Sequence, residues 1–254
     1  MKARRFLAAL LLCFVAAVGS AKAQEAGLQT DAEDPLSLNF DFSVFPLESA
    51  EWKGVLYAPN GDPTDGVEEL VFNPHERTLG YSYSGPAPFR VFRRLVDPEG
   101  EEFFRSVGEI SLKPTRDDLI LFFSLTPDAS RMGPYRIQFM VDSNYTFPED
   151  SVVFFNSTGA TFYGVLGGER VILEPGASKP TDVSSFFDSP APIALVIRDG
   201  DQIHRVLVNR IRFFPDRRTL MILRPPASPN SMRIRTQRLT EYMGDVAPDS
   251  DRGA

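Results

Sequence analysis

Cysteine is almost absent from this chain. The single cysteine, Cys13, lies in an apolar stretch, Phe6–Val18, that follows three basic residues. Ala21-Lys22-Ala23 then gives the small-x-small spacing of a signal-peptidase site, so residues 1–23 are predicted to be a signal peptide. The mature chain would begin at Gln24 without cysteine. It would have no disulfide bond in an oxidising compartment, and its stability would have to come from its core.

Long hydrophobic runs and an excess of positive charge are also missing. The run at the N-terminus is too short to span a bilayer, and no second one follows, so no membrane insertion is expected after cleavage. The formal net charge is -7, and removal of residues 1–23 takes away four basic and no acidic side chains, which leaves -11. An acidic surface of this kind disfavours nucleic acid, whose phosphates require a basic footprint.

Histidine is scarce, and this limits catalysis. The only two histidines, His75 and His204, lie far apart in sequence, and no G-x-S-x-G motif accompanies them. No histidine or carboxylate spacing indicates a metal site. The acidic pairs, such as Asp117-Asp118, place their members on opposite faces of a strand and favour a solvated edge. We therefore expect no catalytic residue, no cofactor and no metal, and the chain is predicted not to be an enzyme.

Helical periodicity is absent, whereas strand signals are frequent. No dozen residues show an amphipathic period of 3.6, and 21 prolines interrupt the chain. Short strand-like apolar segments recur, for example at Asn39–Pro46, Trp52–Tyr57 and Ser151–Phe155, and turn residues separate them. The predicted fold class is all-β, built from two tandem β-sandwich units of the Ig-like or Greek-key type.

An internal duplication is predicted because several landmarks recur in order about a hundred residues apart. Strand, turn and strand around a proline occur at Ile110–Phe123 and Ile211–Leu220, and a similar hairpin is expected at Leu70–Tyr83. Two apolar residues spaced three apart indicate a β-bulge at Gly108-Glu109 and again at Asn209-Arg210.

Further matches place Gly54-Val55-Leu56 beside Gly164-Val165-Leu166 and Leu119 beside Leu220. The predicted organisation is a signal peptide and four further parts: a flexible leader, two units and a disordered tail. Their ranges are 1–23, 24–37, 38–145, 146–243 and 244–254.

Aromatic residues supply the only candidate ligand site. Trp52 is the single tryptophan, and Tyr81 and Tyr83 share one face of a strand. If exposed, these three rings could stack on sugar; if buried, Trp52 would fill the first core, which its match to Phe162-Tyr163 favours.

Three other patterns are weaker. Asn60, Asp62 and Asp65 faintly resemble a calcium loop, but the closing glutamate is missing and a turn is favoured. Arg233 and Arg235 share a strand face that could meet an anionic glycan or an acidic partner, and a solvated face is the simpler interpretation.

One ten-residue stretch, Phe147–Asn156, resembles the cupredoxin strand P-x-G-x-x-V-x-F-x-N. Blue copper requires a cysteine thiolate, which the mature chain lacks, so only sandwich geometry carries over.

Several longer stretches together are similar to an uncharacterised family of exported, β-rich bacterial proteins. They are WKGVLY, YSGPAPFRVFRR, VGEISLKP, YRIQFMVDSNYTFPEDSVVFFNST and the GVLGG that follows, and they span roughly Phe40 to Leu239. The resemblance implies export and a β fold, and it implies no activity. We expect a non-enzymatic binding or structural module of the bacterial envelope, periplasmic or extracellular, whose partner is an envelope protein or a glycan. A carbohydrate-binding module is the alternative, and a hydrolase with a site between the two units is third.

Overall fold

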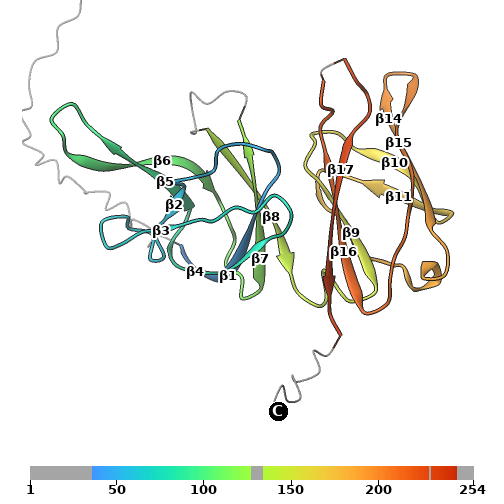
Figure 1. The fold of residues 1–254 in the computed structure, drawn as a ribbon, viewed down its shortest axis with the longest axis horizontal. Coiled ribbons are helices and arrows are strands. Elements are labelled where there is room, and N and C mark those ends of the chain that lie inside the picture. The colour runs from blue at the N-terminus through green and yellow to red at the C-terminus, as the bar shows by residue number, and fades with distance from the viewer. Residues whose placement is uncertain (1–35, 127–133, 229, 245–254) are drawn as a thin grey trace, which may run out of the picture. The chain divides into compact units, whose positions relative to one another are not determined.

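The computed structural model describes residues 36–126, 134–228 and 230–244, and within them the chain is all-β, as the sequence predicts. The one other regular element there is a single 3-10 turn, η1 (Ser184–Phe186). The expected signal peptide, nearly all of the expected leader and all but the first residue of the expected tail lie outside the described residues. The strands form four sheets, named A to D below (Figure 1).

Sheets A and B contain the first eight strands. Sheet A has the order β4-β1-β7-β8, and β1 runs antiparallel to β4 but parallel to β7. Its strands are β1 (Ser37–Pro46), β4 (Thr78–Pro86), β7 (Asp118–Leu125) and β8 (Tyr135–Asp142). Sheet B has the order β3-β2-β5-β6. Its strands are β2 (Leu56–Tyr57), β3 (Glu68–Glu69), β5 (Phe89–Val96) and β6 (Glu102–Ile110).

Sheets C and D contain the remaining nine. In sheet C, β12 and β13 pair with one edge of β9, and the order continues β9-β16-β17, with β9 parallel to β16. Its strands are β9 (Ser151–Asn156), β12 (Gly176–Ala177), β13 (Thr181–Asp182), β16 (Arg217–Arg224) and β17 (Arg235–Tyr242). Sheet D has the order β11-β10-β14-β15. Its strands are β10 (Phe162–Leu166), β11 (Glu169–Leu173), β14 (Ala191–Asp199) and β15 (Gln202–Ile211).

Three buried apolar clusters hold the sheets together. The first joins sheet A to sheet B, the second joins C to D, and the third joins A to C. In β7, Leu119, Leu121 and Phe123 belong to the first cluster, whereas Ile120 and Phe122 belong to the third. Successive side chains of a strand face opposite ways, so an unbroken apolar run such as Leu119–Phe123 buries both of its faces.

The third cluster draws on the same strand positions in both sheets. In sheet A the neighbouring pairs are Phe45 with Phe122 and Ile120 with Met140. In sheet C they are Phe155 with Ile222 and Leu220 with Leu239. The rings of Phe122 and Phe155 stack across the cluster with centroids 3.8 Å apart.

Two strand predictions are wrong. The expected hairpin at Leu70–Tyr83 does not form, because β3 pairs within sheet B and β4 pairs with β1 in sheet A. The strand expected at Trp52–Tyr57 is reduced to Leu56–Tyr57. All three proline-containing stretches therefore share one role: each carries the chain from one sheet to the opposite one. The turn expected at Pro215 is present, with Asp216 at a φ of 57°.

Both bulges exist, but neither lies where the spacing placed it. The register of β5 against β6 shifts between Val91 and Phe92, which leaves Val107 as the extra residue. The register of β14 against β15 shifts between Leu195 and Val196, which leaves Val206. Both extra valines are buried in a core, and the bulge lets each turn inward.

Candidate binding site

The three aromatic residues that could form a sugar-stacking platform if exposed are buried. Trp52 and Tyr81 are each 8% exposed and Tyr83 is 2% exposed, and all three belong to the cluster between sheets A and B. Tyr81 and Tyr83 do share a face of β4, as expected, but that face is the core-facing one. The exposure that a sugar-stacking platform requires is therefore missing at these three residues, and the favoured interpretation, that Trp52 fills the first core, is confirmed.

The tyrosine hydroxyls in this core are used for structure. Tyr81 Oη accepts a bond from the Val71 amide at 2.8 Å, and Tyr83 Oη donates to the Pro86 carbonyl at 2.6 Å. Tyr57 Oη donates to Glu68 Oε2 at 2.8 Å. Burial is the largest cause that raises the pKa of both Tyr57 and Tyr83, and the neighbouring Glu68 carboxylate raises that of Tyr57 further.

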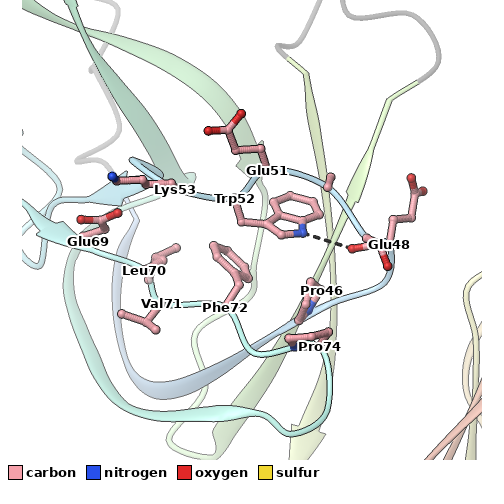
Figure 2. Close-up of a pocket in the computed structure, with 12 residues that line it drawn as sticks. Pro46, Glu48, Glu51, Trp52, Lys53, Glu69, Leu70, Val71, Phe72 and Pro74 are labelled. Atoms are coloured by element: carbon pink, nitrogen blue, oxygen red, sulfur yellow. Dashed lines mark hydrogen bonds between the residues drawn. The ribbon is translucent and has the colours of Figure 1, made fainter.

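Trp52 nevertheless lines a cavity of about 630 Å³, the volume typical of small-ligand sites (Figure 2). Two segments wall it: Pro46 with Glu48–Lys53, and Glu69–Phe72 with Pro74. Figure 2 shows the indole of Trp52 next to the ring of Phe72, and their ring centroids lie 5.1 Å apart. The indole N–H donates to the Glu48 carbonyl at 3.1 Å, which fixes the ring against the cavity wall.

Charged side chains stand around this apolar floor. Glu48, Glu51 and Glu69 line the cavity together with a single base, Lys53. Glu69 Oε1 accepts a bond from the Gly54 amide at 2.8 Å, which ties the two walls together. Three carboxylates against one lysine give the lining a net negative charge that favours a cationic group on a ligand, and the Arg224 charge offsets part of that of Glu48.

Side chains from sheet C bind the two loops that wall the cavity. Arg224 Nη1 donates to the Leu47 carbonyl at 2.7 Å, and Gln237 Nε2 donates to the Pro74 carbonyl at 2.6 Å. Burial is the largest cause that lowers the pKa of Arg224. No sequence pattern indicates these contacts, because Arg224 and Gln237 lie more than 160 residues away from the loops that they hold.

A buried network of four charges lies beside the third cluster. Arg77 and Arg218 each bind both Asp142 and Glu241, and none of the four side chains is more than a quarter exposed. Arg218 Nη1 lies 2.7 Å from Asp142 Oδ1, and its guanidinium stacks 4.4 Å from the Phe147 ring centroid. Two cations against two anions leave the network neutral, which is the arrangement of a structural ion cluster.

Neither histidine lies in a catalytic arrangement. His75 is exposed in the loop before β4, and His204 is half-buried on β15. In the described ranges neither imidazole forms an ion pair, and no group of three metal-ligating side chains gathers. The turn at Asn60–Asp65 is held by its own side chains, since Asp62 Oδ1 accepts bonds from the Thr64 amide at 2.8 Å and hydroxyl at 2.7 Å.

Comparison with protein-family models gives no match to this chain, and comparison with curated protein sequences gives none either. In the part of the chain that the structure describes, no helix has the length and apolar character needed to cross a membrane.

Proposed function

We propose that this protein is an exported, non-enzymatic binding module of the bacterial cell envelope. It would act in the periplasm or outside the cell, and its binding site is the cavity at Trp52. The observation that carries the proposal is this cavity of about 630 Å³, walled by an anchored indole and rimmed by glutamates on an all-β scaffold. Scaffolds of paired sheets commonly present their binding residues on loops, and most residues that line this cavity lie on loops.

The scaffold of the proposal is two tandem β-sandwich units that arose by internal duplication. Sheets A and C have the same central order, with β1-β7-β8 corresponding to β9-β16-β17. In both sheets the first pair of that trio is parallel and the second antiparallel. Sheets B and D likewise correspond as β3-β2-β5-β6 and β11-β10-β14-β15. A shared order that includes an unusual parallel pair supports the duplication more strongly than hairpins would.

The ligand chemistry follows from the walls of the cavity. An apolar side chain would contact Trp52, Phe72 and Leu70, and a neighbouring cationic group would meet the glutamates of the rim. A segment of an envelope protein that carries a lysine or arginine beside an apolar residue has both features. We therefore place an envelope protein first among the partners.

The carbohydrate-binding alternative has less support. Sugar stacking requires an open aromatic face. Trp52 packs against Phe72 and also against Tyr135, with ring centroids 5.3 Å apart, and Tyr81 and Tyr83 lie in the core. A hydrolase between the two units is third, and no observation favours it.

Site-directed photo-crosslinking tests the proposal, because the predicted mature chain has no cysteine of its own. Val71 lines the cavity and is 60% exposed, and Val71→Cys can carry a maleimide photo-crosslinker. Ile172→Cys, at 63% exposed on β11, is the matched control. Incubated with envelope protein extract, the label at position 71 should give a discrete adduct that the label at 172 does not give.

Lys53→Glu and Glu51→Lys separate the charge contribution from the apolar one. Lys53→Glu should leave or strengthen the adduct, whereas Glu51→Lys should weaken it. Equal adducts from both labelled positions, or none from position 71, would refute the cavity as the binding site. Co-sedimentation with purified cell-wall sacculi that Glu51→Lys abolishes would favour the glycan alternative.

A further inference from the structure

Basic residues are concentrated in one late stretch of an otherwise acidic chain. Residues 203–242 contain nine arginines but only two acidic residues, Asp216 and Glu241, whereas the whole chain has 34 acidic residues against 27 basic ones. This stretch comprises most of β15 together with β16 and β17. The uneven distribution gives the protein a local positive region within a negative overall field.

Seven of these nine arginines are exposed, and none of the seven forms an ion pair with a described residue. They are Arg205, Arg210, Arg212, Arg217, Arg233, Arg235 and Arg238. On sheet B, by contrast, Arg90 is paired with Glu109 at 3.1 Å and Arg94 with Glu102 at 3.4 Å. These seven arginines are therefore available to an external anion in a way that Arg90 and Arg94 are not.

Three of the seven gather around two exposed aromatic rings. Arg212 and Arg217 lie over the ring of Phe214, at 5.8 and 5.6 Å from its centroid. Arg217 also lies 5.9 Å from the ring centroid of Tyr242, its cross-strand neighbour. Arg238 joins them, because its Nη1 donates to the Arg212 carbonyl at 3.1 Å. We call Arg212, Phe214, Arg217, Arg238 and Tyr242 the arginine–aromatic cluster.

The cluster stands where the edges of two sheets meet. β15 is an edge of sheet D and β17 is an edge of sheet C. The Ile234 amide, just before β17, donates to the Val206 carbonyl of β15 at 3.2 Å, so the two edges are in contact. Phe214 and Tyr242 are 45% and 56% exposed, although apolar rings are usually covered. These cation–π contacts favour the placement of the guanidinium groups of Arg212 and Arg217 beside the rings before any ligand binds.

We propose that the arginine–aromatic cluster binds an anionic glycan, a polysaccharide that carries carboxylate or phosphate groups. Guanidinium groups bind carboxylates and phosphates through paired N–H donors, and exposed rings pack against the apolar faces of sugars. The cluster offers both features within one small surface. This site goes beyond the proposed function, since its residues are different from those of the Trp52 cavity and neither proposal requires the other.

The net negative charge of the whole chain helps to decide which kind of polyanion the cluster would bind. Double-stranded DNA carries about one charge per 1.7 Å of axis, so a long duplex would meet the repulsion of the net negative charge. A glycan with about one charge per sugar can bring a few anions to the cluster with less repulsion. An acidic glycan is therefore favoured over a nucleic acid.

Binding measurements on protein purified from expression of the full chain test this inference. The probe is an oligogalacturonate, with a neutral malto-oligosaccharide of equal length as the control ligand. The test variant is Arg212→Gln/Arg217→Gln/Arg238→Gln. The matched control is Arg90→Gln/Arg94→Gln/Arg105→Gln, which removes the same charge from exposed positions on sheet B. Calorimetry gives the dissociation constants, and circular dichroism verifies that both variants fold.

We expect the oligogalacturonate to bind, the neutral oligosaccharide not to bind, and the test variant to bind at least tenfold more weakly than the control variant. Phe214→Ala should weaken binding as well, because the ring contributes to the sugar contact. Equal losses in the two triple variants, absence of binding, or equally tight binding of a single-stranded DNA of the same charge would each overturn the inference.

Discussion

Phe122→Ala tests the cluster shared by sheets A and C. Phe122 is fully buried, stacks on Phe155 at 3.8 Å and meets Phe45 edge-on at 6.4 Å. Truncation removes a whole ring from a site where backbone strands on both sides prevent collapse. Buried Phe→Ala changes cost about 3 to 5 kcal/mol, and the rigid surroundings place this one near 4 kcal/mol.

Two probes measure the loss during urea unfolding. Trp52, the only tryptophan, belongs to the core between sheets A and B, so its fluorescence reports that part alone. Far-ultraviolet circular dichroism reports all four sheets. In the unaltered protein the two curves should coincide, since the shared cluster couples the cores; in Phe122→Ala they should shift to lower urea and separate.

Ile172→Ala, at an exposed site on β11, is the control and should change the free energy of unfolding by less than about 0.5 kcal/mol. A loss below about 1 kcal/mol for Phe122→Ala, or probe curves that already separate in the unaltered protein, would refute the coupling.

Three further predictions concern charge, pH and close contact. Asp142→Asn should lower the free energy of unfolding by about 2 to 3 kcal/mol in urea titrations, because Arg77 and Arg218 both lose a buried partner; no change would mean that the ion cluster is dispensable. Tyr57 and Tyr83 have raised pKa values when folded, so the stability that this gives is complete below pH 10.0, the unfolded value, and is lost as pH rises above it. Their ionisation, followed at 295 nm, should coincide with alkaline unfolding, and early ionisation of all seven tyrosines would contradict this. Gly164→Ala should unfold at a markedly lower temperature than Gly159→Ala, since a Cβ at 164 would lie 2.0 Å from the Ala194 carbonyl oxygen and one at 159 meets nothing within 4 Å; equal melting temperatures would contradict that geometry.

The fold class could be predicted from local patterns, but the exact pairing could not. Alternating apolar residues, together with prolines that interrupt helical periods, correctly predicted an all-β chain, because both signals act over a few residues. The match of Leu119 to Leu220 is off by one: β1 Phe42 is paired with Leu119, and the corresponding Val152 is paired with Thr219. A shift by one residue reverses the face of a strand, and sequence spacing alone does not reveal it.

The burial of the candidate aromatic site could not be predicted for a related reason. Tyr81 and Tyr83 were correctly placed on one face, but which face is buried depends on the sheet that lies opposite. One wall of the cavity is Glu48–Lys53, an irregular charged segment. It has no apolar periodicity from which its structure could be predicted. Its supports, Arg224 and Gln237, come from distant strands.

The apolar face that sheet A turns toward sheet C has a consequence for how the chain can be divided. Sheet A alone would expose a contiguous apolar patch, which is unfavourable in water. Its residues are Phe45, Ile120, Phe122 and Met140. Sheet C contributes residues at the same strand positions to the shared cluster. The contact between sheets A and C therefore resembles the interface of a symmetric dimer, in which both subunits use the same surface, except that here both surfaces belong to one chain. The segment from Ser143 to Asp150 joins the two sheets covalently, and its Phe147 is itself buried in the shared cluster. Cleavage within this segment would turn the contact between the two halves into a bimolecular association, which would then depend on protein concentration.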